Sequence, residues 1–247
     1  MRRAFYSALP CLLALLLCAT VALRAYSDDL TVEADAIYAT TPQSGTPMPA
    51  ILRLRDHGPA GLDALAKVRN RLIKEQNAAG EPQTPMLQHR IKMADLAMDY
   101  VAQQRYGHVS KLYWYTDLDA ALAQAKQQNK PVLSLQMLGK LTEEYSCANS
   151  RFFRVLLYAN PDVSDYLRKH YILHWRSVRD VPIITITLSD GSTLKRTTVG
   201  NSAHLVLDSE GNPLNIIPGL WTADTFLDEV TASHALAEQV AKDPVNR

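Results

Sequence analysis

The chain has 247 residues, of which 47% are hydrophobic and 21% charged, and its formal net charge is +1. This length and apolar fraction exclude a disordered chain and suit one domain of ordinary size with an extension. The near-neutral charge argues against a nucleic-acid-binding protein, which would normally carry a basic face. The chain has three cysteines, and their positions matter more than their number.

The N-terminus has the layout of a secretory signal. Arg2 and Arg3 precede an almost uncharged apolar stretch at residues 8–23, and small residues follow. A positive start, an apolar middle and a small-residue end are typical of export. We therefore predict that residues 1–25 are a signal peptide or, if uncleaved, an N-terminal membrane anchor through residues 4–23. The expected location is the periplasm or cell envelope of a bacterium.

Loss of this segment changes the cysteine count. Cys11 and Cys18 lie inside it, and its removal leaves 23 basic and 25 acidic residues with Cys147 as the single cysteine. No internal disulfide can then form. A lone thiol in an oxidising compartment is either buried and inert or available to another molecule.

Residues 26–110 are expected to form a linker followed by a helical extension. Proline and glycine clusters over residues 26–60 predict an irregular linker. Apolar spacing predicts a helix over 60–77 and a second helix after Thr84, with Pro85 at its first position. Two such helices form a hairpin, which packs on the main domain or, alternatively, serves as a stalk that meets a partner or the membrane.

From residue 111 the pattern alternates between strand and helix. Strands are predicted at 111–115, 132–137, 171–175, 183–188, 193–198, 205–207 and 214–217. Helices are predicted after Thr116, over 147–158, after Asn160 and after Thr222. This order indicates an α/β layered domain over residues 111–235, followed by a C-terminal tail over residues 236–247.

Three stretches carry a family resemblance. They are Leu118 to Leu135, Asp162 to Tyr171, and Leu205 to Asp208, which Gly211 and Gly219 follow. Together they resemble the thioredoxin-like superfamily, in particular its exported bacterial members, over about residues 111–231. The resemblance implies a thioredoxin-like three-layer α/β sandwich, here with an N-terminal helical hairpin extension. Residues 143–153 also resemble a signature of uncharacterised members, which implies no activity.

The resemblance places Cys147 at the nucleophilic cysteine of thioredoxins and Ser150 at the second cysteine, so the motif is Cys-x-x-Ser. A helix N-terminus stabilises a thiolate through its free N–H groups and its dipole. Ser150 cannot resolve a mixed disulfide, so the chain could hold mixed disulfides but not run a dithiol cycle alone. We expect Cys147 to attack, with Asn149 and Ser150 supporting it.

Several residues depart from the family pattern. Ser202 stands where the family has a cis-proline, and Ser146 replaces an aromatic residue. Glu143 and Glu144 lie close in sequence and would disfavour a nearby thiolate. The alternative is therefore that Cys147 is a buried, inert small residue.

Other chemistry has weaker support. His174 and His204 are candidates for a Cys–His pair with Cys147, although a hydrogen-bonded strand histidine is the commoner case. Neither metal-ligand spacing nor a cofactor motif is found, so no metal or cofactor is expected. Two functions stay open: thiol–disulfide exchange with a protein thiol, or a non-catalytic binding or scaffold role toward a protein partner.

Overall fold

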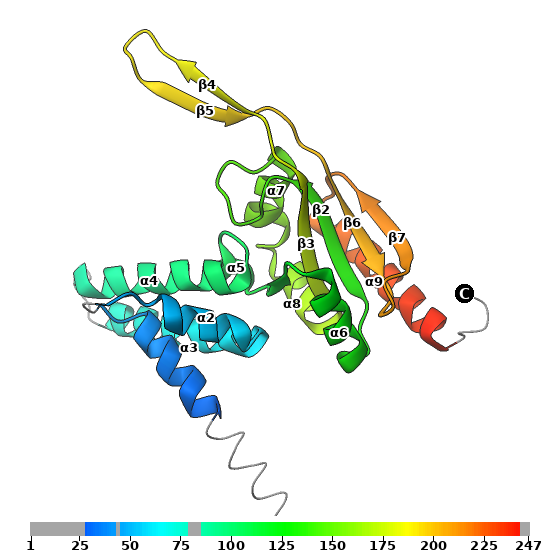
Figure 1. Cartoon of the computed structure of the whole chain (residues 1–247), viewed down its shortest axis with the longest axis horizontal. Coiled ribbons are helices and arrows are strands. Elements are labelled where there is room, and N and C mark those ends of the chain that lie inside the picture. Colours follow the sequence, from blue (N-terminus) through cyan, green and yellow to red (C-terminus); the bar gives the residue numbers. More distant parts are fainter. Residues whose placement is uncertain (1–27, 43–44, 79–84, 243–247) are drawn as a thin grey trace, which may run out of the picture.

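The computed structural model describes residues 28–42, 45–78 and 85–242. The predicted export segment at 1–25 and the predicted cap Thr84 lie outside these residues. The described chain is a mixed α/β structure: a five-stranded mixed sheet with helices on both faces, a helical layer beside it and a hairpin that stands off the body (Figure 1).

The helical layer comes first in the chain. It consists of a helix over residues 28–39, then α2 (Met48–Asp56), α3 (Pro59–Ala78), α4 (Pro85–Ala102) and the short α5 (Gly107–Ser110). The linker predicted over 26–60 is therefore wrong for most of its length. Pro47 and Pro59 stand at helix N-termini, where proline is tolerated because the first N–H groups have no partner within the helix.

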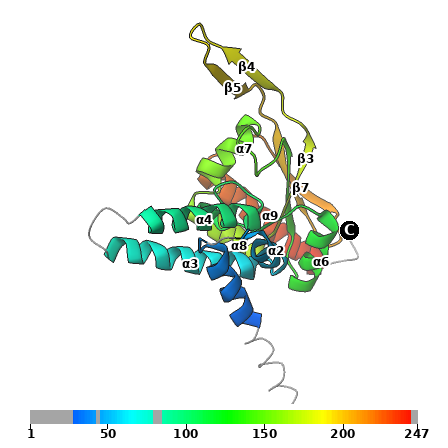
Figure 2. The same cartoon turned by 60° about the vertical axis from the view of Figure 1, so that its left-hand side comes forward.

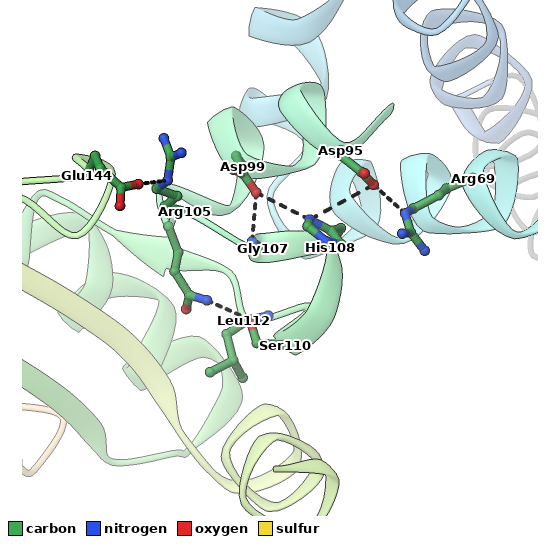
Figure 3. A network of polar contacts seen from close by, with 10 residues as sticks. Arg69, Asp95, Asp99, Arg105, Gly107, His108, Ser110, Leu112 and Glu144 are labelled. Atoms are coloured by element: carbon green, nitrogen blue, oxygen red, sulfur yellow. Dashed lines mark hydrogen bonds and ion pairs between the residues drawn. The ribbon is translucent and has the colours of Figure 1, made fainter. Parts of the chain in front are cut away.

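The predicted helical hairpin is confirmed: α3 and α4 lie side by side (Figure 2). Their facing side chains bury an apolar cluster that includes Leu62, Leu65 and Met98. Arg69 Nε donates to Asp95 Oδ1 at 2.5 Å across the pair, next to His108 of α5 (Figure 3). None of the helices in the described part of the chain combines the length and apolarity that a membrane crossing needs.

The sheet has the strand order β1-β3-β2-β6-β7. Its strands are β1 (Trp114–Tyr115), β2 (Val132–Leu138), β3 (Ile172–Arg179), β6 (Ser202–Leu207) and β7 (Pro213–Pro218). β1, β3 and β2 pair in parallel. β6 pairs antiparallel with β2, and β7 pairs antiparallel with β6. The strand predicted over 111–115 is only two residues long, because the chain before Trp114 turns through the left-handed backbone of Lys111.

Helices cover both faces of this sheet. α6 (Leu118–Gln128) covers one face, and α8 (Pro161–His170) and α9 (Ala223–Lys242) cover the other. Asp117, not the predicted Thr116, caps α6, because its carboxylate accepts the N–H of Ala120 at 2.8 Å. The predicted caps at Asn160 and Thr222 are confirmed. The tail predicted from residue 236 is still part of α9 up to Lys242.

The helix predicted over 147–158 is divided in two. α7 (Ala148–Phe152) is a short α-helix of five residues. A π-helix, η1 (Phe153–Leu157), follows it directly. Single-turn π-helical insertions often occur at functional sites. The wider turn brings Phe153 and Leu157 into the core under the sheet.

The predicted hairpin at 183–198 is confirmed, but its strands do not join the main sheet. β4 (Ile183–Thr187) pairs only with β5 (Thr193–Thr197), and the two form a separate ribbon. The ribbon projects from the body in both views (Figures 1 and 2). Gly191 has φ +80° in its turn, a backbone conformation that glycine adopts without strain.

Arg55 joins the helical layer to the sheet. Its Nη1 donates to the carbonyl of Val101 at 2.7 Å, and its Nη2 donates to the carbonyl of Trp114 at 2.6 Å. The guanidinium also lies over the ring of Tyr113, 4.0 Å from the centroid. One side chain of α2 therefore contacts α4 and the edge strand β1 together.

Candidate thiol site

Cys147 lies where the predicted motif requires it, at the N-terminus of a helix that follows β2. It is the N-cap of α7, with extended backbone at φ −62° and ψ 162°. The N–H of Ser150 donates to its Sγ at 3.4 Å. The sulfur therefore satisfies one of the N–H groups that a helix leaves free at its start.

The thiol is fully buried, at 0% exposure. The chain that leaves β5 covers it, and we call residues 198–201 the stem segment. Within it the carbonyl of Asn201 lies 3.7 Å from Sγ and accepts the thiol hydrogen. The N–H of Ala148 donates to the carbonyl of Val199 at 3.1 Å. The stem segment thus lies directly over the first residues of α7.

Asn149 also holds the chain that covers the thiol, through the residue that follows the stem segment. Its Nδ2 donates to Ser202 Oγ at 2.9 Å, and both residues are buried. Gly200 passes so close that a Cβ atom there would lie 2.3 Å from Asn149 Oδ1. Asn149 therefore positions the chain over the thiol, and the Ser202 hydroxyl faces α7.

Ser150 is buried beside the thiol. Its backbone N–H contacts the sulfur, whereas its Oγ has no hydrogen-bond partner among the described residues. The structure thus brings together all three residues predicted for the site: Cys147, Asn149 and Ser150.

Arg154 belongs to the same cluster, and sequence reasoning missed it. Its side chain is 1% exposed; Nη2 donates to Ser146 Oγ at 3.1 Å and Nε to the Ser150 carbonyl at 3.4 Å. Its Nη1 has no hydrogen-bond partner in the described part of the chain. Burial lowers the pKa of this guanidinium. The four-residue spacing from Ser150 was the available signal, because it places both on one helix face.

The two glutamates before Cys147 are neutralised by ion pairs. Glu144 Oε2 lies 2.7 Å from Arg105 Nε, which ties this loop to the helical layer (Figure 3). Glu143 Oε1 lies 3.1 Å from Lys140 Nζ. Their predicted opposition to a thiolate is therefore reduced, since each carboxylate has a cation next to it.

The two histidines do not form a Cys–His pair. His174 Nδ1 hydrogen-bonds Ser134 Oγ at 2.7 Å, and His204 Nε2 hydrogen-bonds the Tyr158 hydroxyl at 2.6 Å. Burial lowers the pKa of His174 to about 4 and that of His204 to about 3. They lie on opposite faces of the sheet, because Ser134 and Leu135 are their neighbours in register.

A hollow of about 520 Å³ lies between the loop before Cys147 and the strand that enters the hairpin. Gly139, Tyr145, Val181 and Ile183 are among its lining residues. The hollow borders the base of the hairpin on this side.

Chemically, the site is a buried thiol at a helix start with an arginine nearby and a thin cover of chain. No family model and no curated protein matches this chain.

Proposed function

We propose that the chain is an exported thioredoxin-like protein of the bacterial cell envelope that binds a protein partner, and that the β4–β5 hairpin is its binding surface. The observation that carries the proposal is the exposure of the hairpin: every residue of β4 is exposed. The thioredoxin-like assignment has the support of the strand order and of Cys147 at the helix start after β2.

One face of the hairpin is mostly aliphatic and also carries Arg196. Side chains alternate along a strand, and the register sets Ile184 opposite Arg196 and Ile186 opposite Leu194. Ile184, Ile186 and Leu188 are 47%, 45% and 49% exposed. A ribbon that exposes this much aliphatic surface away from the core is typical of an interaction site.

The charges on the hairpin favour an acidic, extended segment of a partner protein. Lys195 and Arg196 have no carboxylate within ion-pair distance among the described residues. The outer edges of β4 and β5 are unpaired, so an extended segment can add to the ribbon as a strand. Acidic side chains on that segment would complement the two cations.

A second copy of the chain and a lipid surface fit less well. Pairing two β5 edges would bring Lys195 and Arg196 against the same residues of the other copy, and like charges across strands are destabilising. The hairpin turn is polar and carries Asp190, which disfavours entry into lipid. The hairpin also lies at the opposite end of the described structure from the helix over 28–39 (Figure 1).

Photo-crosslinking in cells that make the chain naturally tests this proposal. A photoreactive benzoylphenylalanine replaces Ile186 on the mostly aliphatic face, and the matched control replaces its neighbour Thr185 on the other face. We expect adducts from position 186 only, on an acidic, extended stretch of another protein, and their loss in K195E/R196E. Adducts to a second copy, adducts to lipid, or no adducts would each refute the proposal.

Thiol–disulfide exchange is a second candidate, favoured by Cys147 at the start of α7 beside the buried cation of Arg154. In that reaction the Cys147 thiolate attacks a disulfide of the partner. One partner sulfur bonds to Cys147, and the other leaves as a thiolate, so no further oxidant is needed. Disulfide-linked adducts that form with the native chain and disappear in Cys147→Ser would support it, and their absence would refute it.

A further inference from the structure

The cover over Cys147 is a single layer of chain. In the stem segment, Thr198, Gly200 and Asn201 are exposed, and Val199 is partly exposed, whereas the thiol beneath them is fully buried. Displacement of these few residues would therefore expose the buried thiol to solvent.

Few contacts hold this layer in place. The Ala148–Val199 backbone bond and the Asn149–Ser202 side-chain bond join it to α7, together with the long contact from Sγ to Asn201. Apolar burial, which makes global unfolding costly, is small in the stem segment. Such a segment opens at a lower free energy than the whole domain.

The stem segment continues directly from the projecting hairpin. β5 ends at Thr197, one residue before it, and the ribbon pairs with no strand of the main sheet. A hollow of about 520 Å³ borders the other strand of the hairpin base at Val181, and the Gly139 N–H donates to the Arg179 carbonyl at 2.9 Å there. Displacing the stem segment alone therefore breaks few contacts apart from those over the thiol.

We infer that the stem segment is a gate over Cys147, which opens by local displacement and exposes the thiol while the domain stays folded. This inference deepens the thiol-exchange candidate and rests on it for its biological role. It places access to the thiol under the control of the chain that carries the binding hairpin. A partner held on the hairpin would thus meet the thiol only when the gate moves.

The test measures how fast a thiol reagent, dithionitrobenzoate, reacts with the folded full chain carrying C11S and C18S. In Gly200→Ala the added Cβ meets Asn149 Oδ1 and pushes the gate outward. We expect reaction about tenfold faster or more, and a free energy of unfolding lowered to match, by about 1.4 kcal/mol for tenfold, because strain on the closed gate favours opening and unfolding equally. The matched control is Gly45→Ala, where a Cβ meets nothing closer than 3.7 Å, and it should react at the native rate.

A second measurement does not depend on that variant. In the chain that carries C11S and C18S but keeps Gly200, hydrogen exchange at the Ala148 amide should report the same opening as labelling of Cys147, and both should be nearly independent of urea below the transition. The gate is refuted if G200A is labelled at the same rate as G45A. It is also refuted if, with Gly200 present, thiol labelling and hydrogen exchange depend on urea as global unfolding does. The crosslinking at position 186 is unaffected by either result, so the two proposals fail separately.

Discussion

The carboxamide of Asn149 and the hydroxyl of Ser202 are joined by a 2.9 Å hydrogen bond that ties the first turn of α7 to the first residue of β6. These residues are 53 positions apart in the chain, and the hairpin and the stem segment lie between them. The bond fixes where the chain re-enters the sheet, and so it determines that the stem segment covers Cys147.

Asn149→Ala should lower the free energy of unfolding by about 1–3 kcal/mol, because it leaves the buried Ser202 hydroxyl without its donor. Urea unfolding followed by circular dichroism measures this loss. Gln124→Ala removes an amide whose bond to Gln127 is exposed, and it should change stability by less than about 0.5 kcal/mol. Equal effects of the two substitutions would contradict the role given to Asn149.

Arg154→Met should retain most of the stability, and Arg154→Ala should lose about 2–4 kcal/mol. The buried guanidinium has no carboxylate bonded to it among the described residues, and an apolar chain of similar volume avoids the cost of burying a cation. Alanine instead leaves a cavity. Urea midpoints of the two variants decide the matter, and a methionine variant as unstable as the alanine variant would show that the charge itself stabilises the fold.

Stability should decrease with acid below about pH 6.5. Burial lowers the pKa of His204 to about 3 and that of His174 to about 4, so the unfolded chain binds more protons than the folded chain between those values and 6.5. Each group contributes a slope of up to about 1.4 kcal/mol per pH unit there. Above pH 6.5 the contribution is constant.

Urea unfolding at pH 7.5, 6.0 and 5.0 checks this linkage. His204→Phe should have a smaller slope than the native chain by about one proton, since it removes one buried group. Gln124→Ala, which removes no ionisable group, should keep the native slope. An unchanged slope in the His204 variant would show that this histidine is not buried neutral in the folded protein.

Shortening the hairpin should leave the fold intact. Ile183 and Thr197 are opposite each other in register, so an Asn-Gly turn between them can replace residues 184–196. The free energy of unfolding should change by less than about 1 kcal/mol, because the deleted side chains are exposed apart from Leu194, which is partly buried. Asp208→Ala, which removes the acceptor of the Glu210 and Asn212 N–H groups in the other hairpin, should cost more. A large loss on shortening would show that the hairpin packs on the body.

Arg55→Ala should loosen the helical layer from the sheet and lower the free energy of unfolding by about 2–4 kcal/mol. It leaves the buried carbonyls of Val101 and Trp114 without donors and removes the cation over Tyr113. Arg55→Lys should not restore stability, because one ammonium cannot reach both carbonyls in the fork geometry of a guanidinium. Calorimetry measures both, and full rescue by lysine would contradict this account.

Much of the element order could be predicted because local chemistry sets it. Asn160 and Thr222 cap helices as predicted, and the Ser189–Ser192 and Asp208–Asn212 turns join hairpins. The helices over 28–39 and α2 were missed because nearby prolines suggested a linker, whereas Pro42 follows the first of these helices and Pro47 is the N-cap of α2. The π-helical turn at η1 leaves no periodicity signal that distinguishes it from an α-helix.

The sequence by itself determined that Ser150 follows Cys147 in a Cys-x-x-Ser motif and that Cys147 lies at a helix start, because a four-residue motif and a cap are local features. Only the tertiary structure decided that Val199 and Asn201 cover the thiol and that the β4–β5 ribbon stands outside the sheet. Those relationships join segments about 50 residues apart. They depend on how strands pair and pack, which side-chain alternation along one strand cannot specify.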